Sequence, residues 1–447
     1  MRYIPNSSPT SQRKMLRAMG LNELEQLFEN LPDSLRQKSP LDLPAPLNES
    51  ALVSHFGALS EHNANVHEYA SFLGGGAYYH YIPAALDHIL LRSEFYTSYT
   101  PYQAEISQGT LQAMFEFQTY ICELTGMEVA NSSMYDGASS LAEALLMAMR
   151  VTGRKKVAVS RAVHPHYRRV IETYLDDGDK QLIELSFTDD GLTDLAQVSN
   201  HRSDLAALVL QSPNFFGCFE ELSAAASLAH ASGALLVVGI TEPLSLGLAK
   251  PPGHLGADLA AGEGQSFGLP LSFGGPYLGI FAAKGEYLRS MPGRIAGQTC
   301  DDKGRTGYVL TLGTREQHIR REQATSNICT NQALCALAAT TYLALLGKEG
   351  LRELALLNLA KAKYCRDQIE QAPGVELRFP TPTFNEFVVR VTSDLERKVG
   401  RLLEQRIWAG LPLAPFYPEL DDCILVCCTE MISQEAIHLL VEGLAEK

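Results

Sequence analysis

Short apolar runs alternate with helical patterns from about residue 100 to residue 330. The apolar runs have the length of strands and lie at 157–160, 182–187, 206–211, 235–240, 257–261 and 278–283. Segments with helical spacing separate several of them, at 166–175, 192–200 and 221–233. This alternation predicts a mostly parallel, doubly wound sheet with helices on both faces.

The first hundred residues follow a different pattern, which is helical or irregular rather than sheet-like. A helix start at Asn22 precedes ELEQLF, and Pro40, Pro44 and Pro46 then break the pattern into an extended linker. We expect this part to be an arm that clasps a partner.

The pattern changes again after Asn331. A helix through ALCALAATTYLALL and a second helix at 353–371 precede the strand-like runs VELRF, NEFVVRV and ILVCCT, with further helices at 395–407 and at the end. Strands paired through turns beside helices predict a small α+β domain. We therefore predict an arm and linker at 1–98, a large α/β domain at 99–330 and a small domain at 331–447.

Composition narrows the class of protein. The 447 residues are 46% hydrophobic and 20% charged, which is typical of a globular protein with more than one domain. A net charge of −14 argues against a nucleic-acid surface. The N-terminus lacks the pattern of a secretory signal, and no window of ~18 apolar residues suggests a membrane span, so we expect a cytoplasmic protein.

Nine cysteines are scattered without a CxxC pair. Cys427 and Cys428 lie in the apolar run ILVCCT, where cysteines are more often buried hydrophobic residues than metal ligands. We predict no metal site.

Three segments carry candidate chemistry. In MYDGASSLAEALLMAM (134–149) small residues precede a strong helix, whose free N–H groups suit a phosphate, with Ser139 or Ser140 adding a hydroxyl; a capped core helix is the alternative. His164 in HPHY follows a strand end and can face a ligand ring, pair with His166 on a metal, or simply bond to backbone.

The third of these segments is YTPYQAEISQG (99–109). The rings of Tyr99 and Tyr102 stiffen this loop, and Gln103 and Glu105 can orient a small polar ligand by hydrogen bonds. Packing alone explains the tyrosines, but it explains Gln103 and Glu105 less well.

Two further segments leave their role open. Glycines at 74–76 and 272–275 let the backbone approach a ligand or another chain closely, although such runs are more often turns. The segment 314–332 is dense in arginine, at Arg315, Arg320 and Arg321, beside Glu316 and Glu322. It predicts either a solvated ion-pair face or an anion site or interface.

Gln265 is the most informative position. Residues 257–276 read as a strand, a turn and a glycine-rich run, where enzymes that hold pyridoxal phosphate as a Schiff base often carry a lysine. A carboxamide cannot replace that amine. Lys250 and Lys284 are the alternatives for a self-sufficient enzyme, but neither lies at this place in the pattern.

Long strings of residues resemble one known family over essentially the whole chain. They are YTPYQAEISQGTLQAMFEFQTYICELTGMEVAN, QSPNFFG, LSFGGPYLGIFA, MPGRIAGQT and LTLGTREQHIRREQATSNICTNQAL. They resemble the P-protein family of the glycine cleavage system, and within it the N-terminal, or α, subunit of the two-subunit form.

The resemblance implies an aspartate aminotransferase-like fold, that of fold type I pyridoxal phosphate enzymes. The implied activity is that of an aminomethyl-transferring glycine dehydrogenase, which removes CO2 from glycine and passes the aminomethyl group to the lipoyl arm of H-protein. The implied assembly is a heterotetramer of two α and two β subunits. In that family the catalytic half carries the lysine, so the resemblance places the cofactor on the β subunit.

The same resemblance locates the departures of this chain from the catalytic pattern. Gln265 stands where the lysine belongs, and Gly239 and Ile240 stand where an aspartate usually meets the pyridine nitrogen. We therefore expect a chain that is inactive without its β subunit. The residues expected to reach the shared site are Tyr99, Tyr102, Gln103, Glu105 and His164; a purely structural subunit is the alternative.

Overall fold

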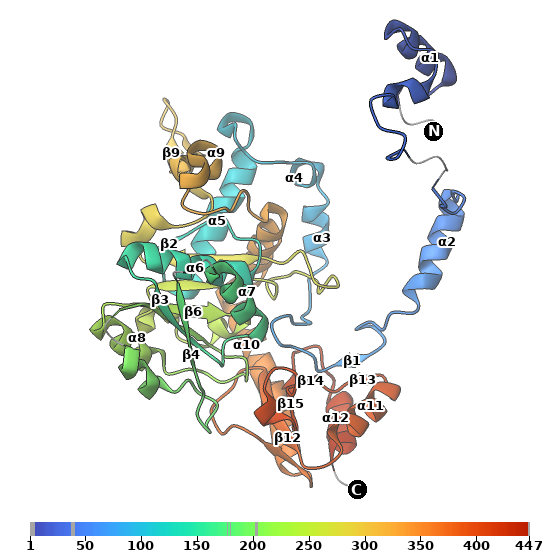
Figure 1. Ribbon diagram of the computed structural model, residues 1–447. Coiled ribbons are helices and arrows are strands. Elements are labelled where there is room, and N and C mark those ends of the chain that lie inside the picture. The colour runs from blue at the N-terminus through green and yellow to red at the C-terminus, as the bar shows by residue number, and fades with distance from the viewer. Residues whose placement is uncertain (1–4, 37–40, 177, 179, 202–203, 446–447) are drawn as a thin grey trace. The chain divides into compact units, whose positions relative to one another are not determined.

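The chain divides into two compact units, Met1–Ala64 and Asn65–Lys447. The computed structural model describes residues 5–36, 41–176, 178, 180–201 and 204–445 (Figure 1). Pro40, which is part of the predicted linker, lies outside the described residues. The predicted boundaries at residues 98 and 330 stay a prediction.

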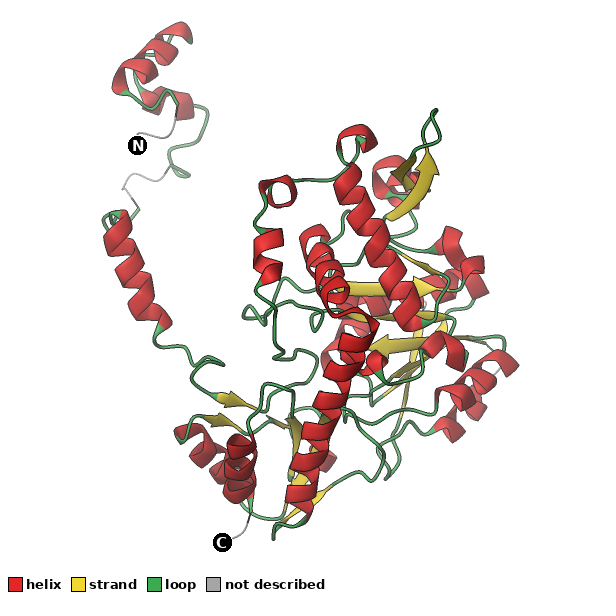
Figure 2. Cartoon of the chain, turned by 180° about the vertical axis from the view of Figure 1, so that it is seen from behind, coloured by secondary structure: helices red, strands yellow, loops and turns green. Residues whose placement is uncertain are grey.

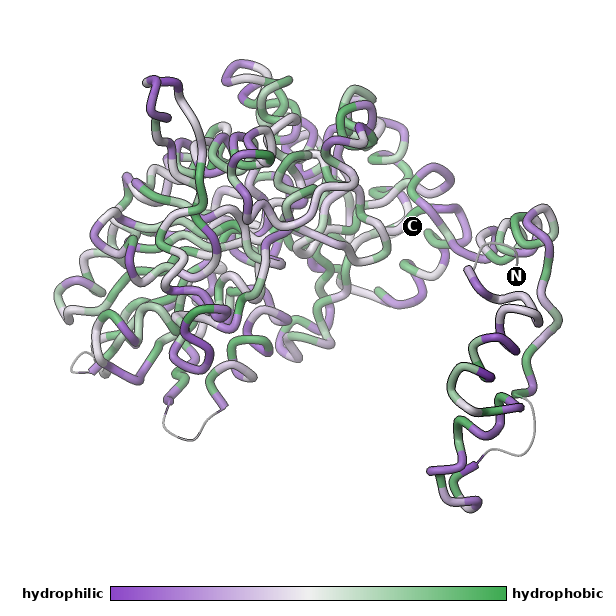
Figure 3. Tube along the Cα trace, turned by 90° about the horizontal axis from the view of Figure 1, so that it is seen from above, coloured by the Kyte–Doolittle hydropathy of each residue, from purple (hydrophilic) through white to green (hydrophobic). Residues whose placement is uncertain are grey.

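The first unit contains helices α1 (Pro9–Ala18) and α2 (Glu49–Ser60), with the 3₁₀ helix η1 (Leu24–Phe28) between them. The predicted helix start at Asn22 is wrong by one residue, because Gln26 accepts the backbone N–H groups of both Asn22 and Glu23 and makes Glu23 the N-cap. Of the residues described in this unit only Leu16 is buried, and Figure 3 shows hydrophobic residues spread along it. The unit therefore has no hydrophobic core of its own.

A seven-stranded sheet is the centre of the second unit. Its strands in chain order are β2 (Val129–Ala130), β3 (Lys156–Ser160), β4 (Gln181–Leu185), β5 (Leu205–Gln211), β6 (Leu235–Ile240), β7 (Leu259–Glu263) and β8 (Gly279–Ala283). The spatial order is β2-β8-β7-β6-β5-β3-β4, and β8 runs opposite to the other six strands. The predicted mostly parallel sheet is confirmed, although the run predicted at 257–261 forms its strand two residues later.

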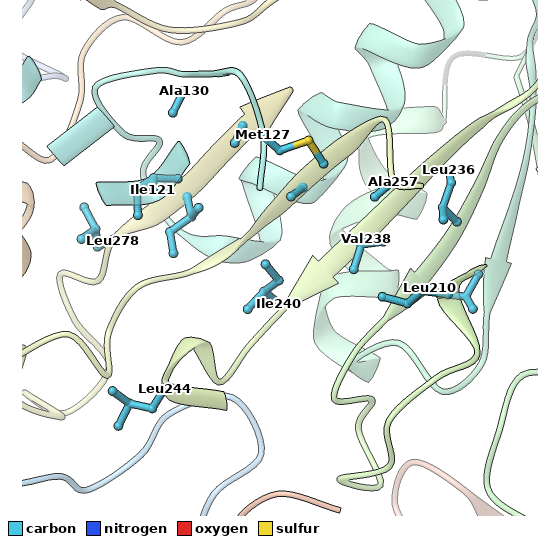
Figure 4. Close-up of a cluster of buried hydrophobic side chains, with 14 of the residues drawn as sticks. Ile121, Met127, Ala130, Leu210, Leu236, Val238, Ile240, Leu244, Ala257 and Leu278 are labelled. Carbon is cyan, nitrogen blue, oxygen red and sulfur yellow. The ribbon is translucent and has the colours of Figure 1, made fainter. Parts of the chain in front are cut away.

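Helices cover both faces of this sheet because its strands are apolar on both sides. Leu208 and Leu210 of β5 pack with α5 (Gln108–Thr125), α8 (Leu222–Ala231) and α10 (Ala333–Glu370), in the cluster of Figure 4. Ala207 and Val209 point the other way, toward α6 (Gly137–Thr152) and α7 (Pro165–Leu175). This period of two is what a fully buried strand requires.

The helix predicted at 192–200 is wrong, since this segment forms the 3₁₀ helix η3 (Leu195–His201). Gln197 accepts the backbone N–H of Ser186 at 3.1 Å and donates to Asp194 at 2.9 Å. These bonds hold a tight turn against the end of β4 instead of a longer α-helix.

A second, antiparallel sheet has the order β11-β12-β15-β14. Its strands are β11 (Val375–Leu377), β12 (Glu386–Val391), β14 (Leu411–Pro412) and β15 (Cys423–Cys427), and it packs with α11 (Leu395–Glu404), α12 (Gln434–Leu444) and the second half of α10. The short strand β1 (Ala70–Ser71) pairs in parallel with β13 (Ile407–Trp408). This arrangement matches the predicted α+β pattern.

The two successive helices predicted after Asn331 are confirmed, and together they form α10 (Ala333–Glu370) (Figure 2). They meet in a kink at Gly347, whose φ of 60° and ψ of −174° are not helical and suit a residue without a Cβ. Contrary to expectation, α10 is long and apolar enough to cross a membrane by length and composition alone, since an 18-residue window of it has a mean hydropathy of 1.2. Half of that window is buried inside the protein, and a buried core helix can have the same length and hydropathy.

The remaining helices and strands of this unit lie outside the two sheets. They are α3 (Ala85–Leu90), α4 (Ser93–Tyr96), α9 (Gln317–Arg320) and the hairpin of β9 (Ile295–Cys300) with β10 (Thr306–Thr311).

Candidate functional site

Gln265 is buried two residues beyond the end of β7 and is 1% exposed. Its Oε1 accepts the backbone N–H of Tyr78 at 2.8 Å, and its Nε2 donates to the carbonyls of Tyr78 at 3.0 Å and Leu269 at 2.7 Å. The carboxamide thus pairs with the backbone of Tyr78 in the way a neighbouring strand would. A lysine amine has no acceptor, so it would leave the N–H of Tyr78 without a partner.

The segment that Gln265 holds is 72–81, which follows β1 and includes the glycine run. His164 donates from Nε2 to the Gly75 carbonyl at 2.6 Å, and Glu386 at the start of β12 accepts the Gly75 N–H at 2.6 Å. Gly76 has φ +101°, and a Cβ there would lie 2.8 Å from the His164 ring. The glycines therefore allow close approach, as predicted, but to other parts of the same chain.

Glu263, the last residue of β7, takes the place where the sequence suggests a bound phosphate. Its carboxyl accepts backbone N–H groups from Gly137 at 3.0 Å, Gly264 at 3.0 Å, Gln265 at 3.1 Å and Leu278 at 2.8 Å. Gly137 is the first residue of α6, so the carboxyl sits at the positive end of that helix. Burial raises the pKa of Glu263 to about 8, although the N–H bonds oppose this shift.

The serines predicted to add hydroxyls to a phosphate are engaged elsewhere. Ser139 donates its hydroxyl to the Asp136 carbonyl, while its N–H donates to the Asp136 side chain at 2.8 Å, which caps α6. Ser140 donates to the carbonyl of Ile280 in β8. The capped core helix is the alternative that the structure bears out.

His164 is the N-cap of α7 and is buried against aromatic rings. Its Nδ1 accepts the His166 N–H at 3.1 Å, and its ring stacks on Tyr167 with centroids 4.7 Å apart and meets Phe215 edge-on. Burial lowers its pKa to about 4, which keeps the ring neutral at physiological pH. The alternative of a loop histidine bonded to backbone is the one observed.

A buried ion-pair cluster lies beyond β6 and was not predicted. His80 contacts Glu242 through Nε2 at 2.9 Å and Glu430 through Nδ1 at 2.8 Å. Burial opposes protonation of this imidazole, but the two carboxylates outweigh it and raise its pKa to about 10. Glu242 lies just beyond Gly239 and Ile240, the positions where the resemblance leads us to look for an aspartate. Its carboxylate is already paired with the His80 imidazole.

Tyr78 and Glu386 extend this cluster toward the small sheet. The Tyr78 hydroxyl donates to Glu386 Oε2 at 2.7 Å. Burial raises the pKa of Glu386 to about 7, although its bonds to Gly75 and Tyr78 lower it. Sequence reasoning missed these residues, because isolated acids and a tyrosine carry no spacing pattern. The segment LGGGAYYHY was a local hint.

The predicted loop at 99–105 is exposed. Tyr99 is 89% exposed, and Gln103 and Glu105 also face solvent. Tyr102 is anchored, since Arg294 donates to its hydroxyl at 3.2 Å and lies over its ring at 5.5 Å. The four residues therefore lie on one loop. His164 is not part of this loop, and its contacts are with the Gly75 carbonyl and with the rings of Tyr167 and Phe215.

The arginine-rich segment 314–332 is not the helical ion-pair face that its spacing suggests. Arg315 donates to the carbonyls of Leu312, Met291 and Gly293, which ties the segment to the loop before β9. Glu316 lies 3.5 Å from the buried Arg294. These are structural contacts with backbone and with one buried guanidinium.

The alternative lysines and metal ligands find no support. Lys284 forms an ion pair with Asp258, which His230 also contacts, and Lys250 is exposed. Among the described residues no group of three or more His, Cys, Asp or Glu side chains is arranged to hold a metal ion.

These residues do not fit a covalently held pyridoxal phosphate. Such a group needs an amine for its aldehyde and free donors for its phosphate. Gln265 provides a carboxamide that is already bonded, and the N–H groups at the start of α6 and beyond β7 already bind Glu263. The segment 72–81 also lies against Gln265, because the backbone of Tyr78 bonds to its carboxamide.

Comparisons with known proteins agree in one family. A family model described as "Glycine cleavage system P-protein" matches residues 1–444. A protein of Desulfitobacterium hafniense named "Probable glycine dehydrogenase (decarboxylating) subunit 1" is 52% identical over 447 residues, with all of both chains covered.

Solved structures extend the likeness to the fold. A crystal structure of glycine decarboxylase (P-protein) of the glycine cleavage system, in inhibitor-bound form, matches with a TM-score of 0.90 and 44% identity over 99% of both chains. Glutamate decarboxylase of Lactobacillus brevis matches with a TM-score of 0.69 at 12% identity, over 92% of this chain and 95% of that one. At that identity the likeness concerns the fold alone, which is that of fold type I pyridoxal phosphate enzymes.

We expect Glu263→Ala to destabilise the chain by about 2–4 kcal/mol, because each buried donor left without an acceptor costs ~1–3 kcal/mol and water restores part of the loss. Inorganic phosphate should raise the melting temperature of this variant but not that of the wild type. Sodium chloride at equal ionic strength is the control. A variant as stable as the wild type in the absence of phosphate would contradict this role of Glu263.

The His80 cluster predicts a pH dependence of stability. Its folded pKa of about 10 lies above the ordinary value of 6.5, so its contribution is complete below pH 6.5 and is lost as pH rises through 10. In urea unfolding the wild-type midpoint should fall over this range, and it should fall less in His80→Gln. The exposed control His62→Gln should keep the wild-type slope; equal slopes in all three would refute the assignment.

Proposed function

The chain belongs to the P-protein family of the glycine cleavage system, and we propose that it is the subunit that shapes the active site without anchoring the cofactor. It corresponds to one of two halves of the glycine-decarboxylating enzyme, since its relatives are named subunit 1. Pyridoxal phosphate belongs to this enzyme system, and we assign its covalent attachment to the second subunit.

The bonding of Gln265 carries this proposal. Its carboxamide uses both its acceptor and its donors on the backbone of Tyr78 and on Leu269. A lysine at this place would break the pairing, and Glu263 occupies the donors that a phosphate needs. The chemistry that an amine supplies must therefore come from the partner.

We assign the contact with the shared site to the loop at 99–105. Tyr99, Gln103 and Glu105 are exposed on it, while the bond of Tyr102 to Arg294 fixes the loop to the body of the subunit. Such a loop can present a carboxamide and a carboxylate to a polar substrate in the partner. His164 also remains a candidate, although its contacts with Gly75 and Tyr167 support a role in holding the segment 72–81.

The exposed hydrophobic side chains of the first unit support the proposal that this chain has a partner. These side chains lie along η1 and α2 and include Leu27, Phe28, Val53 and Phe56. Exposed apolar surface of this extent marks a protein interface. We propose that it packs on the second subunit in an α2β2 assembly, which acts in the cytoplasm on glycine and on the lipoyl arm of H-protein.

The assignment of the cofactor is tested by reduction with borohydride. The purified chain and its second subunit are each treated with pyridoxal phosphate, alone and mixed, then reduced and mapped by peptide mass. We expect the label on a lysine of the second subunit only, and CO2 release from glycine only in the mixture. Label on Lys250 or Lys284 of this chain would overturn the proposal.

The loop is tested by Gln103→Ala in the mixed enzyme. Loss of one hydrogen bond to a charged group costs ~1.5–3 kcal/mol, so kcat/KM for glycine should fall about tenfold or more while assembly persists on size exclusion. Gln112→Ala is the matched control, since Gln112 is exposed on α5 and bonds only to Glu116 in its own helix. Full activity in Gln103→Ala would favour a purely structural subunit.

A further inference from the structure

A cavity of about 470 Å³ lies between α6, α7 and the segment 317–327. Its walls include Glu143 of α6, Tyr174 of α7, and Arg321, Ser326 and Asn327 of the segment. The volume falls within the ~300–1,000 Å³ of small-molecule sites. None of these residues belongs to the buried cluster around Gln265.

Glu143 is the unusual feature of this cavity. Its side chain lies in the middle of α6 and is 1% exposed, and its Oε2 has no hydrogen-bond partner among the described residues. Burial raises its pKa, while the Ser326 hydroxyl and the charge of Arg150 lower it. A buried acceptor without a donor is energetically unfavourable, so a ligand that donates to Oε2 gains free energy that the protein alone does not recover.

The segment 317–327 brings a positive charge to this cavity. Arg321 lines the cavity with φ 52° and ψ −121°, a backbone conformation that a residue with a Cβ rarely adopts. Strain of this kind is concentrated at ligand sites and switches. The charged residues that line the cavity are Arg321 and two acids, Glu143 and Glu322, and Thr173 and Tyr174 add hydroxyls.

We propose that this cavity binds a small zwitterion of the α-amino acid type. An ammonium group supplies the hydrogen-bond donor that Glu143 Oε2 lacks, and a carboxylate matches the planar donors of Arg321. A ligand with both groups can pair with Glu143 and with Arg321, whereas a simple amine or a simple acid pairs with only one of them. The inference is independent of the proposed function, because every lining residue belongs to this chain.

The test uses glycine as the probe and the full chain alone, without its second subunit or pyridoxal phosphate. Binding is measured by calorimetric titration and by saturation-transfer NMR. We expect saturable binding to the wild type, at least about tenfold weaker binding to Glu143→Gln and to Arg321→Gln, and weaker binding of methylamine and of acetate than of glycine.

The control is Glu172→Gln, the same change at an exposed residue of α7 that does not line the cavity. It should bind glycine as the wild type does. Glu143→Gln preserves the shape of the side chain and removes a buried acid, so we expect its melting temperature to match or exceed that of the wild type.

Three results would overturn the inference. The first is that the wild type shows no saturable glycine binding, as when water alone satisfies Oε2. The second is that Glu143→Gln binds glycine with the same affinity as the wild type. The third is that acetate binds as tightly as glycine, which indicates an anion site. Glycine bound elsewhere in the chain would give the second result. A failure here leaves the borohydride experiment unaffected, so the two proposals can be judged separately.

Discussion

The pairing of the Gln265 carboxamide with the backbone of Tyr78 is the constraint on which the centre of this molecule depends. Buried N–H and carbonyl groups must find partners, and segment 72–81 has no sheet to supply them at Tyr78. The Gln265 side chain supplies both an acceptor and a donor to Tyr78 instead. Once Tyr78 is held, its hydroxyl reaches Glu386 of β12, and His80 two residues later lies between Glu242 and Glu430.

These bonds connect the ends of the large sheet to the small antiparallel sheet. Gln265 follows β7, Glu242 follows β6, and Glu386 begins β12, so a single segment joins elements far apart in the chain. Each buried polar group is met by a group of the protein itself: the Glu263 carboxyl by backbone N–H groups, and the Glu242 carboxylate by the His80 imidazole. Side chains of this subunit thus occupy the donors that a bound phosphate would need.

The sequence predicted what depends on local pattern. Strand β6 was placed at 235–240 because both of its faces are apolar, and α7 was placed within one residue because its spacing is helical. Pattern could not reveal the bond of Glu263 to Gly137, 126 residues away, or the contacts of His80, which are 162 and 350 residues away. It did separate the two helices that form α10, which meet where Gly347 leaves the helical conformation. The place of Gln265 was predicted from the family resemblance, but its partners were visible only in the fold.

The carboxyl of Glu263 has a consequence for how the subunit is maintained. A protein that binds a ligand only when folded gains stability in proportion to the logarithm of ligand concentration, and it loses that gain when the ligand is scarce. Here the group that accepts these N–H bonds, the Glu263 carboxyl, is covalently part of the chain, so its effective concentration never changes. We therefore expect the folded fraction of this subunit to be indifferent to the supply of vitamin B6.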